Sequence, residues 1–490
     1  MKKLKEHKKD VILFIIVFLI SIVMCGAFLQ PHYTHDTYKI VRDGYEFYSY
    51  DKFLKESRPF TATITLLADK INLSIESYMI ISFVLALIFL SASVVVMYKI
   101  FSKKNENNSK LINICIILLS FVTIFNYLAI EHIYFLECCI LALGILLSVF
   151  AAKIIIDKEK YAYVKSIILI IIAVFCYQGS IAIFPMILLT YKLLFEKNNL
   201  KDNFIEIVKL ALIYGMAMLL TIIFAKFLMG GSRITVNYTQ IDILNIFHWF
   251  KELVINSLGV IPPYVNISII ALTCICLLIL YKANAKEKII YIFKYLLVTL
   301  TAIAISLAPV ILGSGLDLTP RMCISYGTTI GISLLALVYV TSKNNRKYQV
   351  ITLFIITICV FALNVALYVV LTNQHILTNK MDAERCQDIK QAVEEYEAST
   401  GIKVTKLAAV WRGDLDLYYP NMMHAGAITQ KALNSWASRE AITFYLDREM
   451  RFMPFSIEQY VNFFVYEKSE KYTTEPIVIE GDILYYNGSS

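Results

Sequence analysis

Residues 11–30 read VILFIIVFLISIVMCGAFLQ, a run of 20 residues without a charged side chain. A helix needs roughly 20 apolar residues to cross the hydrocarbon core of a bilayer. Ten further apolar runs follow, and they occupy residues 78–101, 111–130, 133–156, 166–177, 181–195, 207–229, 264–281, 289–312, 325–341 and 348–371. The pattern predicts a polytopic α-helical membrane protein with about 11 transmembrane helices, of which the fifth and sixth are short and share the break at residues 177–180.

The composition supports this fold class. Of the 490 residues, 58% are hydrophobic and only 17% are charged, whereas roughly a quarter of a soluble domain is charged. The net charge of +8 reflects Lys and Arg in the connecting segments, so we do not expect a nucleic-acid partner. The ten cysteines lie almost entirely in apolar runs, which is typical of core packing.

The distribution of basic residues predicts the orientation. With a cytoplasmic N-terminus, the inner segments carry 22 Lys and Arg in 62 residues, and the short outer segments carry 9 in 97. Cytoplasmic loops of membrane proteins are enriched in basic residues. We therefore expect a multi-pass protein of the cell membrane whose N-terminus is cytoplasmic and whose C-terminus is extracytoplasmic.

Two domains are expected. Residues 1–371 form the membrane domain, with a first outer loop at 31–77, and residues 372–490 form a small extracytoplasmic α/β domain. Within the tail, residues 382–399 and 430–446 are predicted to be helical, and residues 404–410 and 476–486 are predicted to form strands.

Polar residues near the outer ends of the spans are the candidates for chemistry, because polar groups at membrane depth are costly and tend to be functional. Asp36 follows the first span by six residues, where it could act as a general base; a solvated turn residue is the alternative. Arg58 and Arg321 lie on different outer loops and could hold a phosphate, although an interfacial anchor also explains Arg321.

Further candidates line the same outer level. Glu131 and His132 occupy the expected outer turn between the third and fourth spans, and Glu137 is expected one to two turns into the fourth span. The break at Tyr177 and Gln178 could recognise sugar hydroxyl groups or could be a plain hairpin turn. Asp414 and Asp416 match the metal-binding Asp-x-Asp pattern, but a pattern this short often occurs by chance.

The order of these motifs resembles the bacterial membrane glucosyltransferases of the Gtr type II family, which belong to the GT-C group. The resemblance rests on Asp36, Ser57-Arg58-Pro59-Phe60, Tyr177-Gln178 and Pro320-Arg321-Met322. It covers residues 1 to about 371 and implies a GT-C-like fold, a polyprenyl-phosphate sugar donor, usually carrying glucose, and an extracytoplasmic glycan acceptor. His35 stands in the first of two positions that are often both acidic in the family, which leaves the sugar and the acceptor open.

The sequence therefore predicts a glycosyltransferase that moves a hexose from a polyprenyl-phosphate carrier to an extracytoplasmic polysaccharide or cell-wall polymer. Asp36 is the expected base, Arg58 and Arg321 bind the donor phosphate, and Glu137, Tyr177 and Gln178 shape the sugar pocket. No cofactor is expected besides the lipid-linked sugar, and a divalent metal has no clear ligand set to support it. A transporter or flippase, or a polymerase, of lipid-linked sugars is the alternative.

Overall fold

The computed structural model describes residues 2–103, 109–196, 200–231, 243–312, 318–344, 346–411, 417–456, 463–464 and 477–488. Its contacts divide the chain into two units. The first contains residues 1–29 and 49–369, and the second contains residues 30–48 and 370–490. Each unit therefore includes segments that are distant in the sequence.

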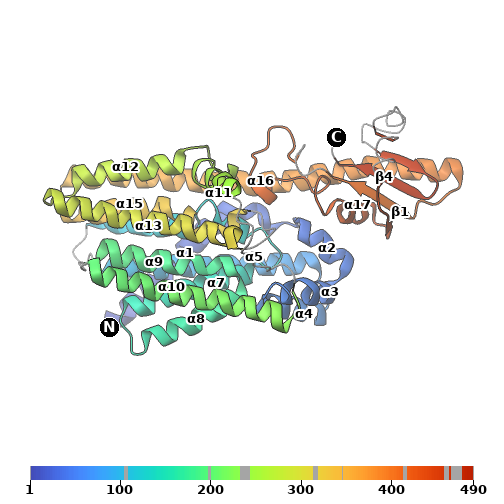
Figure 1. Ribbon diagram of the computed structural model, residues 1–490. Helices are drawn as coiled ribbons and strands as arrows, with labels where there is room; N and C mark the ends of the chain where they lie inside the picture. Colours follow the sequence, from blue (N-terminus) through green and yellow to red (C-terminus); the bar gives the residue numbers. More distant parts are fainter. Residues whose placement is uncertain are drawn as a thin grey trace. The chain divides into compact units, whose positions relative to one another are not determined.

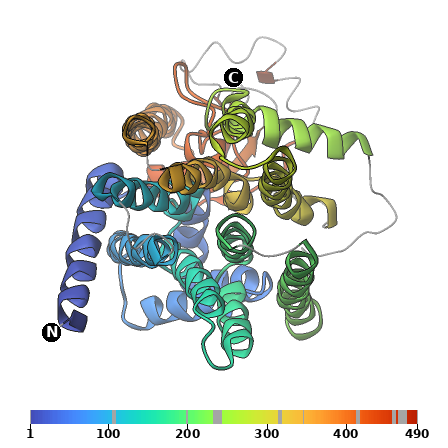
Figure 2. The same cartoon turned by 90° about the vertical axis from the view of Figure 1, so that its left-hand side faces the viewer.

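The first unit is helical (Figure 1). Its α-helices are α1 (Lys2–Cys25), α4 (Pro59–Lys70), α5 (Ile75–Ser102), α6 (Lys110–Ile124), α7 (Cys138–Ile156), α8 (Ala162–Cys176), α9 (Ile183–Leu189), α10 (Leu200–Ile223), α11 (Ile243–Phe250), α12 (Val265–Leu280), α13 (Ala285–Leu312), α14 (Ile324–Gly327) and α15 (Thr329–Asn344). α16 (Lys347–Thr400) contributes residues to both units. Figure 2 views many helices of the first unit end-on, so these helices run in roughly a common direction.

Within the described residues, eight helices are long and apolar enough to cross a membrane, and each coincides with a predicted apolar run. Three shorter apolar helices, α6, α8 and α12, fall on the remaining runs. Exposed aliphatic side chains are frequent on these helices, among them Leu19, Leu212 and Leu272. Lipid can cover such a surface, whereas water cannot do so without cost. The chain is therefore a membrane protein, and the number of crossings stays a prediction.

The structure corrects the sequence analysis between the third and fourth runs. The sequence is largely apolar on both sides of Glu131-His132, so a tight turn was expected at these two residues. Instead, α6 ends at Ile124 and α7 begins at Cys138, with a short 3-10 helix at Ala129–His132 between them. The buried Asn126 stabilises this irregular segment, because its side chain donates to Thr123 O at 3.0 Å and accepts from Leu128 N at 3.1 Å. Glu137 is the N-cap of α7 and does not lie one to two turns inside a helix, as was expected.

The second unit contains a four-stranded sheet in the order β2-β1-β4-β3. Its strands are β1 (Lys406–Val410), β2 (Arg451–Phe452), β3 (Ile477–Glu480) and β4 (Ile483–Asn487). β1 pairs in parallel with β2 and β4, and β3 pairs antiparallel with β4 across a turn in which Gly481 has φ of +59°. The expected helix at 430–446 is shorter, because α17 covers only Ser438–Leu446. The expected helix at 382–399 is the end of α16.

Helix α2 (His35–Asp43) belongs to the second unit, although it follows the first span in the sequence. Thr34 caps the helix, and its hydroxyl accepts from Thr37 N at 3.1 Å. Tyr38 is completely buried in the core of the unit, and its hydroxyl lies 2.7 Å from that of Tyr445 on α17. The first part of the predicted outer loop is therefore an integral element of the C-terminal unit.

Candidate active site

Eight polar and aromatic residues of the first unit form a group that we call the arginine cluster. All of them come from connections between helices, and they are Glu56, Arg58, Glu131, His132, Glu137, Tyr177, Gln178 and Arg321. Five of the six predicted site residues are members, and the sixth, Asp36, lies in the second unit.

Arg58 is placed by the turn that precedes α4. Arg58 is the N-cap of this helix, and Pro59 is its first residue, a position that proline favours because its φ is already helical. One guanidinium nitrogen, Nη2, lies 3.2 Å from Glu56 Oε2, and Nη1 lies 3.9 Å from Glu137 Oε1. The guanidinium carbon lies 4.8 Å from the centre of the Tyr177 ring, which is within cation–π range.

Gln178 supports the turn that carries Arg58. Its side-chain Nε2 donates to Glu56 O at 2.8 Å and approaches Ser57 O at 3.4 Å. Ser57 has a positive φ of 61°, which is uncommon for a residue with a side chain. Its hydroxyl is buried and donates to Thr221 O at 2.6 Å. The amide nitrogen of Gln178 therefore positions the Arg58 turn, and the contact of Gln178 with sugar stays a prediction.

Arg321 lies on the 3-10 helix Pro320–Met322, which has only three residues. The backbone N–H of Arg321 donates to Glu131 Oε2 at 3.2 Å, and Nη1 of Arg321 lies 3.6 Å from the same oxygen. The guanidinium carbon is 4.5 Å from the centre of the Phe135 ring. A carboxylate of the protein thus occupies the expected anion position.

Gly179 brings the two arginine-bearing connections together. A Cβ atom at this position would lie 2.5 Å from Tyr177 Cε1 and 2.7 Å from Arg321 O, so both approaches require glycine. The two guanidinium groups are close enough to influence each other, because Arg321 opposes the charge on Arg58. The pKa of Arg58 is nevertheless raised: burial disfavours the cation, but Glu56, Tyr177 and Glu137 favour it.

His132 supplies a neutral polar group next to these charges. Burial, together with the charge of Arg321, lowers the pKa of His132 to about 3. Its ring contacts that of Tyr177 edge-on, with the centroids 5.5 Å apart. Both ring nitrogens are buried, and neither has a hydrogen-bond partner among the described residues. Unsatisfied buried nitrogens are costly, so the imidazole is suited to a ligand that supplies the missing hydrogen bonds.

The arrangement can bind a phosphate beside a sugar. The arginine–carboxylate separations of 3.2 to 3.9 Å exceed the roughly 2.8 Å of a tight charge-assisted bond. A phosphate oxygen that comes closer can therefore compete with the carboxylates. Burial raises the pKa of Tyr177, and the two arginines partly offset this effect, so Tyr177 retains a hydroxyl proton that it can donate to the ligand.

Asp36 lies in the first turn of α2, where a carboxylate is favourable for the helix dipole, and its side chain is half-buried. Its position as the base of the reaction stays a prediction. Sequence reasoning assigned no role to Glu56, His132 or Gly179, although Glu56 and Gly179 each lie close in sequence to an assigned residue. In the described ranges, no group of three His, Cys, Asp or Glu side chains is placed to hold a metal ion. Asp414 and Asp416 lie outside the described residues.

Comparison with known proteins identifies the family. None of the curated proteins matches the chain. The family model described as "Glucosyl transferase GtrII" matches residues 25–333, which include Asp36 and every member of the arginine cluster. The match covers more than half of the chain, so a role as a glycosyltransferase follows from it. The chain is a member of the GtrII glucosyltransferase family of membrane proteins.

Proposed function

We propose that this glycosyltransferase uses a polyprenyl-phosphate hexose, with glucose as the expected sugar, and transfers the hexose to a polysaccharide or cell-wall polymer outside the cytoplasmic membrane. The observation that carries the proposal is the meeting of Arg58 and Arg321 around Tyr177. These arginines are 263 positions apart in the sequence, yet both act electrostatically on the same tyrosine hydroxyl. Two guanidinium groups suit a phosphate that gains negative charge as it departs.

In the proposed reaction, an acceptor hydroxyl oxygen attacks the anomeric carbon of the hexose. The bond between that carbon and the phosphate oxygen breaks, and the phosphate leaves with the electron pair. Asp36 takes the proton of the acceptor hydroxyl, and the two arginines stabilise the charge on the phosphate. Glu137, Tyr177 and the neutral His132 are available to hydrogen-bond sugar hydroxyl groups, while Gln178 holds the Arg58 turn in place.

The topology fits this chemistry. The excess of basic residues in the inner segments supports a multi-pass orientation with a cytoplasmic N-terminus and with residues 31–77 and the C-terminal unit on the outer side. A lipid-linked sugar presents its hexose at that membrane surface, and it carries its own leaving group. The reaction therefore requires neither a nucleotide nor ATP.

The test is transfer by the purified full-length chain in liposomes. We expect transfer from a polyprenyl-phosphate hexose to polysaccharide of the source cells, and none from a nucleotide sugar. Asp36→Asn should lower the turnover at least about 100-fold, the contribution typical of a general base. Asp51→Asn, which changes an exposed carboxylate paired with Lys55, is the matched control. Full activity of Asp36→Asn, or transfer only from a nucleotide sugar, would refute the proposal.

A further inference from the structure

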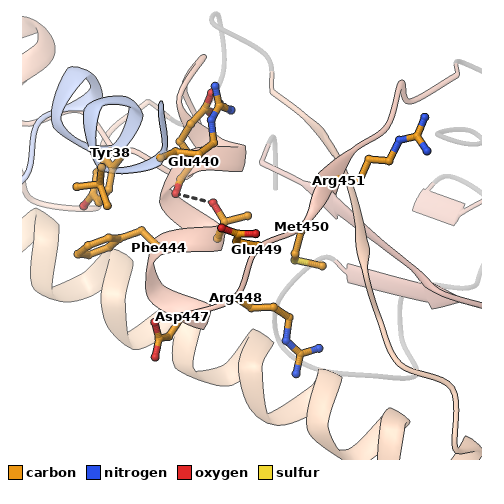
Figure 3. Close-up of a pocket in the computed structure, with 11 residues that line it drawn as sticks. Tyr38, Glu440, Phe444, Asp447, Arg448, Glu449, Met450 and Arg451 are labelled. Atoms are coloured by element: carbon orange, nitrogen blue, oxygen red, sulfur yellow. Dashed lines mark hydrogen bonds and ion pairs between the residues drawn. The ribbon is translucent and has the colours of Figure 1, made fainter. Parts of the chain in front are cut away.

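The second unit contains a cavity of about 720 Å³ (Figure 3). This volume lies within the range of roughly 300–1,000 Å³ that is usual for small-ligand sites. The lining comes from α2, from α17 and from the segment that leads into β2, and consists of Tyr38, Val41, Arg42, Glu440, Thr443, Phe444, Asp447, Arg448, Glu449, Met450 and Arg451. The cavity shares no residue with the arginine cluster, since all its lining residues belong to the second unit.

The charges in the lining are balanced. Three arginines face three carboxylates, and the protein itself neutralises two of these arginines. Arg42 Nη1 lies 2.7 Å from Glu440 Oε1, while its Nε lies 2.6 Å from Asp43 Oδ1. Arg448 Nη1 lies 2.6 Å from Glu397 Oε1. Such a lining has no net positive charge to attract a polyanion. It does offer both hydrogen-bond donors and acceptors, which suits hydroxyl groups because each of them donates and accepts.

Apolar surface accompanies these polar groups. Tyr38 and Phe444 lie on one side of the cavity in Figure 3, and Arg451 lies on the other. The exposed Trp436 lies beside the first turn of α2: its ring is 6.1 Å from the ring of His35, and Lys39 Nζ is 6.0 Å from its centre. Tyr38 is buried, so the half-buried Phe444 and the exposed Trp436 are the rings that offer apolar faces against which the C–H surfaces of a sugar can pack.

We infer that this cavity binds a neutral, hydroxyl-rich segment of the acceptor polysaccharide. The inference rests on the proposed function and restricts the acceptor to neutral glycans. The lining carries no net positive charge that would bind a phosphate-rich polymer. α2 carries both Asp36 and three residues of the lining. At 1.5 Å per helical residue, Arg42 lies about 9 Å along the axis from Asp36. A bound chain is therefore held at a fixed distance from the proposed base.

The test is direct binding to the full-length protein in nanodiscs. Polysaccharide from the source cells is cut by mild acid, and anion exchange separates the fragments into a neutral and an acidic pool. Saturation-transfer NMR then reports which pool binds. Val41→Trp fills the cavity from an exposed position on α2, and Ile402→Trp places the same side chain at a similarly exposed position outside the lining. A second variant, Glu449→Gln with Arg451→Gln, removes two exposed charges without adding volume.

We expect the neutral pool to bind, Val41→Trp and the double variant to weaken binding at least ten-fold, and Ile402→Trp to bind as the wild type does. Binding of the acidic pool alone, binding of neither pool, or unchanged binding by Val41→Trp and the double variant would overturn the inference. The transfer assay is read separately. Failure of the wild type to transfer hexose refutes the proposed function, whereas transfer with an unchanged KM for polysaccharide in Val41→Trp refutes only the inference.

Discussion

Replacing Gly179 with alanine tests how closely the two arginine-bearing connections must approach. The added Cβ would lie 2.5 Å from Tyr177 Cε1 and 2.7 Å from Arg321 O, whereas ordinary contact begins at about 3.4 Å. The neighbouring groups must therefore move by about 0.9 Å and 0.7 Å. One of the two is a backbone carbonyl, which cannot rotate away as a flexible side chain can.

This displacement moves Arg321 relative to Tyr177 and Arg58. A misplacement of about 1 Å in a catalytic arrangement can cost about 100-fold in rate, or about 2.7 kcal/mol of transition-state stabilisation. We expect Gly179→Ala to lower kcat/KM for the lipid-linked donor by this factor, while the protein still inserts into membranes and purifies. Initial rates in liposomes at several donor concentrations measure the effect.

Gly215→Ala is the matched control. Gly215 lies within α10, is exposed, and has no atom within 4 Å of the position of its absent Cβ. Alanine is the better helix former by about 1 kcal/mol, so this variant should be as stable as the wild type or more stable, with full activity. Wild-type kcat/KM in Gly179→Ala would show that the close approach of residues 179 and 321 is unnecessary for activity and would refute the reasoning.

Three further predictions concern the arginine cluster. Arg58→Lys and Arg321→Lys keep the charge but lose the planar fork, so each should raise the KM for the donor at least about ten-fold in the same assay; an unchanged KM for both would argue against phosphate binding. Gln178→Met removes the hydrogen bond to Glu56 O, so it should lower the free energy of unfolding by about 1 kcal/mol and should also lower kcat. Thermal unfolding measures the first effect, and initial rates measure the second. Wild-type values of both would exclude a positioning role. His132 has a folded-state pKa of about 3, below its usual value, so the unfolded chain binds more protons under acidic conditions and stability is lost as the pH falls below about 6.5. At about pH 5 the loss should be about 2 kcal/mol, and His132→Phe should therefore show a smaller fall in Tm between about pH 7.5 and pH 5 than the wild type; equal falls would contradict a buried neutral imidazole.

The sequence predicted the helical runs well because long apolar stretches leave few other structures open to a chain in lipid. It failed where apolar residues form irregular structure. Residues 125–137 are as hydrophobic as a helix, so the end of α6 at Ile124 and the N-cap position of Glu137 were missed. Asn126 is the first polar residue in this stretch, and its effect depends on how its amide group is oriented.

The candidate site was predictable in its members more than in its contacts. Short motifs and their order indicated Arg58, Tyr177 and Arg321, and the structure brings these residues together. The sequence did not reveal that Gln178 would hold the Arg58 turn, because that contact joins positions 122 residues apart. In the same way, the contact between Tyr38 and Tyr445 spans 407 residues, so no local pattern could assign α2 to the C-terminal unit.

The assignment of α2 to the C-terminal unit bears on how such enzymes can be re-engineered. The backbone passes between the two units at residues 29–30, 48–49 and 369–370. A truncation that removes only the tail would leave Tyr38 without the core that buries it, and exchange of the tail alone would pair a foreign sheet with the native α2. A working chimera would have to transplant residues 30–48 and 370–490 together, because both stretches build the same core.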